Sequence, residues 1–404
     1  TVVTYPDIQE GYDEVFGDIV YDEVAGNFSM IGLSREKGDE GGGGTYDKLT
    51  MTVSSSDLEN PTVYTNDING IDMFNSGWNN LWEEWAKTGY HSSNRVSGVA
   101  TGDFASYNGQ FFWIHDGNGS VNANVSIQDS NWGSEGVYNY MDNIGQILHS
   151  TLYYYLSAQI IRTDDGGCDS QSPSDPVIAK SDVNGNLLYY LAIDYEPDTS
   201  KNMIWRKANI FKGDGDSFYI YGQSERCGFS NSEQIWMFKV TDTGTEFTLD
   251  GSYNLSALSG APTELGSYPH LGVVQDVASD MFRFIIFTAG SNSGLSKWSI
   301  NPQSGDVTYE GTHSDLFSST AHHWEMKGFG ENLYIVNSDG NIKVSRINTN
   351  SMTKVWEKSY DLFGTQSQDA LGGMTTHNIG NGGVAITGKT RPGAGDEWDA
   401  FILL

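Results

Sequence analysis

The chain has 404 residues, of which 48 are Gly, only 9 are Pro and 13% are aromatic. Its 52 acidic residues outnumber 22 basic ones, for a net charge of −30. A surface this negative repels phosphate backbones and anionic lipid, which disfavours nucleic-acid and membrane-surface partners. The sequence has no run of about 18 apolar residues, the length a membrane-spanning helix needs.

A short turn followed at once by a compact apolar run recurs along the chain. Clear copies occupy residues 26–31, 108–113, 216–220, 280–285, 331–336 and 381–386, and 153–156 is a copy without the turn. Such a repeat is typical of a radial array of small sheets. Aromatic and β-branched residues favour strands, and Gly, Asn and Asp favour turns. The sequence therefore predicts an all-β protein.

Each repeat can be divided into up to four strands. The predicted units, in chain order, are 17–65, 98–140, 146–193, 205–253, 272–311, 324–360 and 374–404. The last unit is one strand short, and Thr1–Tyr5 is a β-branched run without a partner of its own. Adding it to the last unit removes an unpaired edge. We predict one domain, 1–404, folded as a seven-bladed β-propeller closed by its N-terminal strand. The number of predicted strands is by itself also compatible with six or eight blades.

The last unit carries a more specific pattern. Residues 384–390 read Val-Ala-Ile-Thr-Gly-Lys-Thr, and residues 399–403 read Asp-Ala-Phe-Ile-Leu. This pair resembles the SBBP-type repeat of secreted β-propellers, and residues 31–34 with 46–49 resemble it more loosely. The resemblance implies an extracellular propeller and implies no catalytic residue. The start at Thr1 fits a removed signal segment or a trimmed chain, and the sequons at Asn27, Asn118, Asn124 and Asn254 suit a secreted glycoprotein.

One segment has helical periodicity. Trp78, Leu81, Trp82 and Trp85 fall at i, i+3, i+4 and i+7, which predicts a short helical insertion over 76–88. The helix either caps the propeller with its tryptophan stripe or docks a partner, such as a neighbour in a surface or fibre assembly. Trp78, Trp82 and Trp85 are therefore candidate binding residues.

Histidines suggest a second candidate site. His149, His270, His322 and His323 are predicted near the entrances of first strands, with His313 and His377 nearby. From different blades they could converge at a channel mouth and hold a transition metal, although their spacing matches no local motif. His149, His270 and Trp324 are also candidate binding residues on this face. Structural or water-bonded histidines are the alternative.

Two further predictions concern loops. Cys168 and Cys227 fall in equivalent loops of adjacent units, which favours a disulfide between them. Asp182 and Asn184 alternate with Gly in a way that could bind Ca²⁺, but a plain hairpin turn explains them equally well.

Taken together, the sequence favours a secreted, non-catalytic binding or structural module for a protein or glycan. The alternative is an enzyme with a metal or acid–base site at the histidine-lined mouth, since no catalytic signature decides between them.

Overall fold

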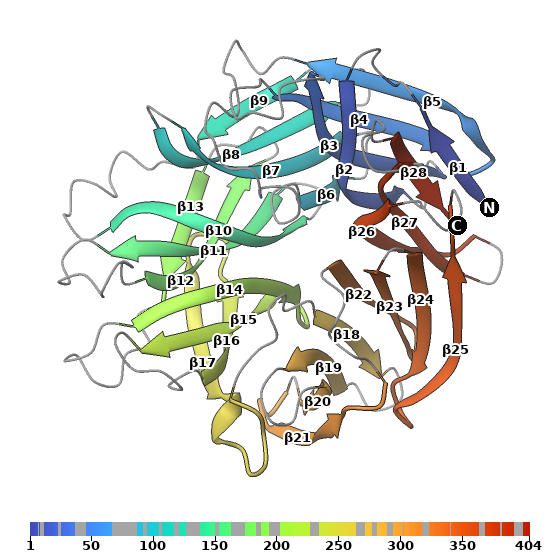
Figure 1. Ribbon diagram of the computed structural model, residues 1–404. Coiled ribbons are helices and arrows are strands. Elements are labelled where there is room, and N and C mark those ends of the chain that lie inside the picture. The colour runs from blue at the N-terminus through green and yellow to red at the C-terminus, as the bar shows by residue number, and fades with distance from the viewer. Residues whose placement is uncertain are drawn as a thin grey trace. The chain divides into compact units, whose positions relative to one another are not determined.

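The structure is a computed structural model of residues 1–404. It describes the whole chain except residues 7, 9–11, 23–25, 37–45, 67–86, 92–94, 105–106, 117–120, 127–137, 150–152, 163–173, 183–186, 194–202, 227–233, 264–270, 277–280, 289–293, 302, 317–322, 340, 363–367, 380–381 and 392–398. The described strands form seven antiparallel sheets of four strands (Figure 1). The prediction of an all-β protein is confirmed.

The chain divides into two compact units, and each is described by itself. The first unit contains Thr1–Asn108, Phe112–Asn124 and Ser319–Leu404. Its sheets are built from β2 (Tyr12–Asp22), β3 (Asn27–Glu36), β4 (Tyr46–Ser54) and β5 (Asp57–Asn66); β6 (Lys87–His91), β7 (Arg95–Phe104), β8 (Tyr107–Asp116) and β9 (Val121–Ser126); β22 (His323–Phe329), β23 (Asn332–Asp339), β24 (Asn341–Asn348) and β25 (Thr353–Tyr360); and β1 (Val2–Tyr5) with β26 (Gln368–His377), β27 (Gly383–Arg391) and β28 (Asp399–Leu403).

The second unit contains Gly109–Phe111 and Val125–Ser318. Its sheets are β10 (Tyr138–His149), β11 (Tyr153–Arg162), β12 (Ser174–Asp182) and β13 (Leu187–Ala192); β14 (Met203–Lys212), β15 (Ser217–Arg226), β16 (Gln234–Asp242) and β17 (Phe247–Asn254); and β18 (Leu271–Asp276), β19 (Met281–Thr288), β20 (Gly294–Ile300) and β21 (Val307–His313). Except for the sheet containing β1, every sheet runs in sequence order, the arrangement of a propeller blade.

The N-terminal strand belongs to the last sheet. Val2 pairs with Leu403 and Tyr5 with Ala400. The ammonium of Thr1 donates to the carbonyl of Leu404 at 3.0 Å, so the two ends of the chain lie side by side (Figure 1). The N-terminal segment therefore pairs with a strand of the last sheet, β28, as predicted.

In the predicted repeat 98–140, the expected strands are displaced by one strand relative to the observed sheet β6–β9. The sheet begins with β6, which the prediction missed, and Lys87 and Thr88 of the expected helix lie in that strand. The strand expected at 136–140 overlaps β10, which opens the next sheet. Pairing of Lys87 with Val99 of β7 explains the difference, because a partner strand stabilises a segment whose own composition is a poor strand signal. The tryptophan-bearing part of the expected helix lies outside the described residues.

The cores lie between neighbouring sheets within each unit. In the first unit, Phe16, Phe28 and Met30 of the first sheet pack with Ala400 and Ile402 of the last. In the second, Phe218 and Ile220 meet Ile178 on one side, and on the other face of that sheet Tyr219 and Trp298 lie in a second cluster. Strand β20 is buried at every residue.

The fold is propeller-like. First strands of neighbouring sheets, such as β2 with β26 and β10 with β14, contact each other within each unit. The helical element among the described residues is one 3₁₀ turn, Leu255–Ala257, capped by the side chain of Asn254. In the described chain, no helix is long and apolar enough to cross a membrane.

Candidate functional site

The two ends of each four-stranded sheet differ. At one end, the hairpins that join the first strand to the second and the third to the fourth are short; Ser55 and Ser56 alone link β4 to β5. We call this the hairpin end. The connections at the opposite end, the loop end, include the long segments 67–86 between β5 and β6 and 255–270 between β17 and β18, although 105–106 and 340 at this end are short. Long connections are where binding residues usually gather.

Most sequence-predicted site residues lie outside the described residues. They are Trp78, Trp82, Trp85, Cys168, Asn184, Cys227, His270 and His322. Asn184 falls between β12 and β13 at the hairpin end, and the others fall in loop-end connections. The disulfide, the tryptophan surface and most of the metal hypothesis therefore stay predictions.

The remaining predicted residues are placed on strands. His323 and Trp324 open β22 at the loop end. His149 is the last residue of β10, so it lies at the hairpin end rather than at a strand entrance. Asp182 ends β12 and pairs with Tyr153. Within the described part of the chain, no group of three His, Cys, Asp or Glu side chains could hold a metal ion.

Asp182 occupies a recurring turn position. At the end of three other third strands, or just after it, the side chains of Asp242, Asn301 and Asn348 accept a hydrogen bond from the N–H two residues on. Such turns fix a hairpin locally without any ion. The position therefore favours the hairpin interpretation of Asp182.

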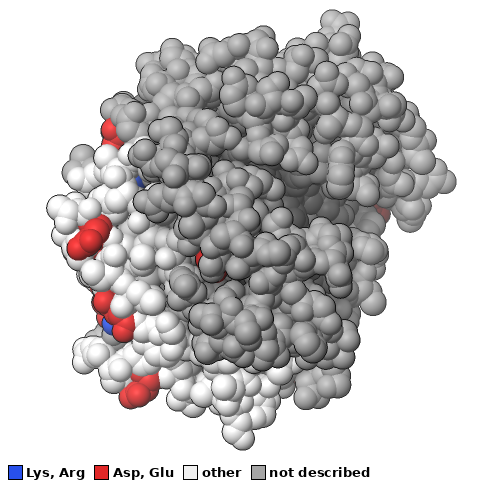
Figure 2. All heavy atoms as spheres, turned by 90° about the vertical axis from the view of Figure 1, so that its left-hand side faces the viewer, with Lys and Arg blue, Asp and Glu red and all other residues white. Residues whose placement is uncertain are grey.

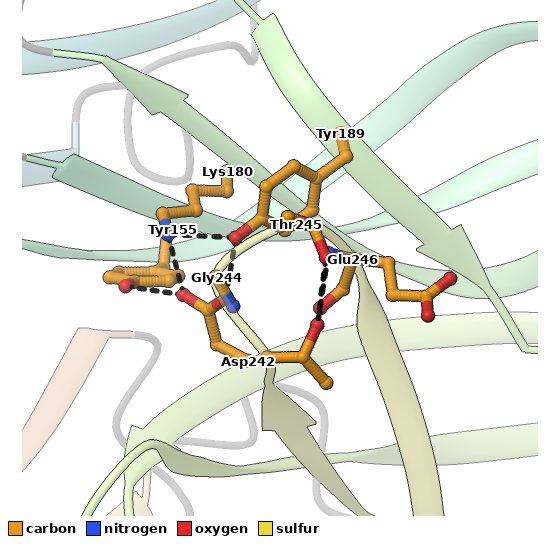
Figure 3. Close-up of polar contacts among 8 residues, drawn as sticks. Tyr155, Lys180, Tyr189, Asp242, Gly244, Thr245 and Glu246 are labelled. Atoms are coloured by element: carbon orange, nitrogen blue, oxygen red, sulfur yellow. Dashed lines mark hydrogen bonds and ion pairs between the residues drawn. The ribbon is translucent and has the colours of Figure 1, made fainter.

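The most elaborate polar cluster in the described structure lies between sheets β10–β13 and β14–β17 (Figure 3). Asp242 Oδ2 accepts hydrogen bonds from Lys180 Nζ at 2.7 Å and from Tyr155 Oη at 2.8 Å. Its Oδ1 accepts from Tyr189 Oη and, at 2.8 Å, from the N–H of Gly244. We call Tyr155, Lys180, Tyr189 and Asp242 the charged seam.

The side chain of Lys180 is buried and has several polar and aromatic partners, as Asp242 has several donors. Its side chain is 4% exposed, against 6% for Asp242, and it also donates to Tyr189 Oη at 2.7 Å. Its Nζ lies 3.8 Å from the centroid of the Tyr153 ring, a favourable position for a cation. A buried ion pair needs such extra partners to offset the loss of hydration.

The electrostatics of the charged seam favour one protonation state for each of these groups. Burial alone would raise the pKa of Asp242, but hydrogen bonds from Lys180 and Tyr189 lower it to about 2. Burial would lower the pKa of Lys180, and its bonds to Asp242 and Tyr189 raise it instead. Burial and the hydrogen bond to Asp242 raise the pKa of Tyr155. A general acid or base titrates near the working pH, so this cluster suits positioning of two sheets rather than proton transfer.

Lys180 belongs to a structural repeat that our sequence prediction missed. In the pairing of the third strand with the fourth, the register shifts directly after Lys180. Lys239, Lys297 and Arg346 precede the same shift in three other sheets. The sequence signal is a basic residue two to four positions before an Asx turn. Lys297 pairs with Glu310 at 2.6 Å, so Lys180 and Lys297, which are buried, contribute little positive charge to the surface.

The loop end holds the other buried carboxylates of the described residues: Glu14 near the start of β2, Asp175 near the start of β12 and Glu325 near the start of β22. Glu325 Oε1 lies 3.2 Å from Lys327 Nζ. Acidic side chains with restricted solvent access beneath long loops can orient polar ligand groups.

The described surface is mainly acidic where it carries charge. In the second unit, Asp214, Asp216, Glu246 and Asp250 are exposed. Figure 2 shows acidic side chains as separate spots over the described part of this side. Their spacing indicates a distributed negative field and not a compact anionic pocket.

No protein-family model matches this sequence, and no curated protein matches it. Among solved structures, the chain is similar to an ulvan lyase of a polysaccharide lyase family, with 9% identity over 96% of this chain and 94% of that chain and a TM-score of 0.56. The structure of such an ulvan lyase bound to -[GlcA(1-4)Rha3S]- gives 10% identity, 93% and 94% coverage and a TM-score of 0.55.

A β-propeller domain of the Trilobed protease from Pyrococcus furiosus matches with 7% identity, 96% and 93% coverage and a TM-score of 0.47. At these identities, the likeness to the ulvan lyases is one of fold. It agrees with the propeller-like class that the sheets define, and it carries no residue of a site to this chain.

Proposed function

We propose that this protein is a secreted, seven-bladed propeller that binds a glycan through the loop end of its sheets. The observation that carries the proposal is the asymmetry of the sheets. Their hairpin end is closed by short turns and by the charged seam, whereas long connections and the buried acids Glu14, Asp175 and Glu325 lie at the loop end. Ligand sites favour the end where loops can vary without disturbing the scaffold.

Closure of the ring is part of this proposal. Seven sheets of four strands and the pairing of β1 with β28 support it. The hydroxyl of Tyr5 adds a contact, since it donates to the carbonyl of Leu58 in the first sheet at 2.7 Å. Membership of the SBBP-type family would fit such a molecule, and we retain it as part of the proposal.

A glycan is the preferred ligand class for two reasons. Structures with this fold include ulvan lyases, one of them bound to a saccharide, so the scaffold accommodates carbohydrate chains. Predicted loop-end residues include Trp324, and aromatic faces stack on sugar rings. With a net charge of −30, we expect a neutral or cationic glycan to bind better than a polyanionic one.

Binding is tested by titration calorimetry of the full chain against neutral, cationic and uronic-acid oligosaccharides. Trp324→Ala should weaken binding at least tenfold without changing the melting temperature. Trp356→Ala, on the outer strand β25, is the matched control and should leave affinity unchanged. Failure of every saccharide to bind would refute the glycan proposal and leave a protein partner as the ligand.

A second candidate is an enzyme acting at the same end. The buried carboxylates of Glu14 and Glu325 favour it, because catalytic acids and bases commonly lie where access of solvent is restricted. Incubation with polysaccharides and analysis of chain length would detect cleavage. Elemental analysis of native protein, repeated on His322→Ala and His323→Ala, would test the metal version. Turnover without a bound metal would support the acid–base version.

A further inference from the structure

A buried histidine lies between the first and the last sheets. His377 ends β26 and is 8% exposed. Its ring meets Phe28 and Tyr21 of the first sheet edge-on, with centroid distances of 5.9 and 6.1 Å. A side chain of the last sheet is thus enclosed by aromatic rings of the first.

The ring of His377 is hydrogen-bonded to backbone groups of the segment that follows β26. Nδ1 accepts a hydrogen bond from the N–H of Ile379 at 3.3 Å. A second hydrogen bond joins the ring to the backbone of Val384. The neutral ring therefore carries its proton on Nε2, since Nδ1 is the acceptor. A second proton would place an N–H at Nδ1, facing the N–H of Ile379.

The described glycines of this connection leave little space to relieve that conflict. Gly382 has a φ of +77°, and a Cβ there would lie 2.7 Å from the ring of Phe329. A Cβ on Gly383 would lie 3.2 Å from Nε2 of His377. Gly382 thus lies close to Phe329, and Gly383 lies close to the imidazole of His377.

We propose that His377, together with Ile379, Gly382 and Gly383, forms an acid-sensitive clasp, which holds the last sheet against the first when the ring is neutral and releases it when the ring is protonated. The clasp belongs to the same sheet as β1, so its release would loosen the sheet in which the two chain ends meet.

The groups around the ring offer no compensation for the added charge. From β2 the neighbour is Tyr21, from β3 it is Phe28, and from β27 they are Gly383 and the backbone of Val384. None of these described neighbours is a carboxylate that could pair with the added charge. Burial accordingly lowers the pKa of His377, and the hydrogen bond to Val384 opposes the shift only in part.

The sign of the pH effect follows from this direction. As pH falls below about 6.5, the unfolded chain takes up the proton first, so stability is lost on acidification. The contribution of His377 is fully present above that pH and declines below it.

The proposal is tested by NMR titration of His377 in the wild-type protein and by hydrogen exchange at pH 7 and pH 5. We expect His377 to titrate below free histidine, and exchange of β1, β26 and β27, corrected for intrinsic rates, to rise severalfold at pH 5 relative to strands β15 and β16. His377→Gln should remove this pH dependence, whereas His313→Gln should retain it. A wild-type His377 that titrates at or above free histidine, or an unchanged pH profile in His377→Gln, would overturn the clasp.

Discussion

Two contacts between neighbouring sheets use opposite chemistry. The charged seam of the second unit places a buried carboxylate among four donors. The contact between the first and last sheets, which we call the aromatic seam, consists of Tyr5, Phe16, Phe28, Gly372 and His377. Sheets with the same four-stranded plan are therefore joined by an ion pair in one place and by close apolar packing in another.

The two seams therefore tolerate different substitutions. An apolar contact depends on shape and is weakened by volume changes, because protein interiors are close-packed. A buried ion pair depends on every partner, because removal of one leaves an uncompensated charge. The two seams should also fail at different pH values, the aromatic seam through His377 below about 6.5 and the charged seam only at much lower pH.

The largest effect is expected at the centre of the charged seam. Asp242→Ala should lower the free energy of unfolding by about 3–5 kcal/mol, because Lys180 stays buried without its counter-ion. Urea denaturation monitored by tryptophan fluorescence measures it. Glu246→Gln, exposed in the same hairpin, is the control and should change stability by no more than about 0.5 kcal/mol. Equal losses in the two variants would mean that the seam does not stabilise the sheets.

The aromatic seam should be most sensitive to added volume. A Cβ at Gly372 would lie 1.7 Å from the carbonyl oxygen of Phe16, a backbone atom that cannot rotate away. Gly372→Ala should therefore cost about 3 kcal/mol. Gly215→Ala, whose φ of +58° is strained but whose Cβ meets no atom within 4 Å, should cost about 1 kcal/mol. Thermal denaturation compares them, and a smaller cost at Gly372 would contradict the close approach of β2 and β26.

Acid should weaken the charged seam in a narrow window. Its carboxyl pKa falls from 3.8 to about 2, so the contribution of Asp242 is full above about pH 4 and is lost as pH falls toward 2. The corresponding loss is about 2 kcal/mol. Stability measured from pH 5 to pH 2 in wild-type protein and in Asp242→Asn would show it. Parallel curves for the two proteins would place the acid sensitivity elsewhere.

The smallest effect concerns one hydroxyl on the N-terminal strand. Tyr5→Phe removes the hydrogen bond to the carbonyl of Leu58 and should cost about 1 kcal/mol. Val2→Ala, on the same strand but 41% exposed, should change stability by less than about 0.5 kcal/mol. Differential scanning calorimetry of both variants measures these changes. An unchanged stability of Tyr5→Phe would show that the contact between β1 and β5 is energetically neutral.

Much of the strand pattern could be predicted because it is local. Apolar runs after tight turns located most strands outside the second sheet, and the β-branched run at Thr1–Tyr5 indicated a missing partner. The second sheet was misassigned because the helical spacing of Trp78, Trp82 and Trp85 led us to extend the predicted helix to Thr88. Lys87 and Thr88 instead pair with β7. The turn at Asp182 was equally readable as an ion site, since local residues alone do not distinguish the two.

The all-β class, the acidic character and the four-stranded repeat follow from local sequence, because periodicity, composition and turn residues act over a few neighbours. Only the tertiary structure decided that Lys180 meets Asp242, 62 residues away, and that His377 lies against Phe28. These pairs leave no signal in the local sequence, because they form only when separate sheets pack together. A charge or an imidazole buried there needs a partner from the other sheet to offset the cost of its burial.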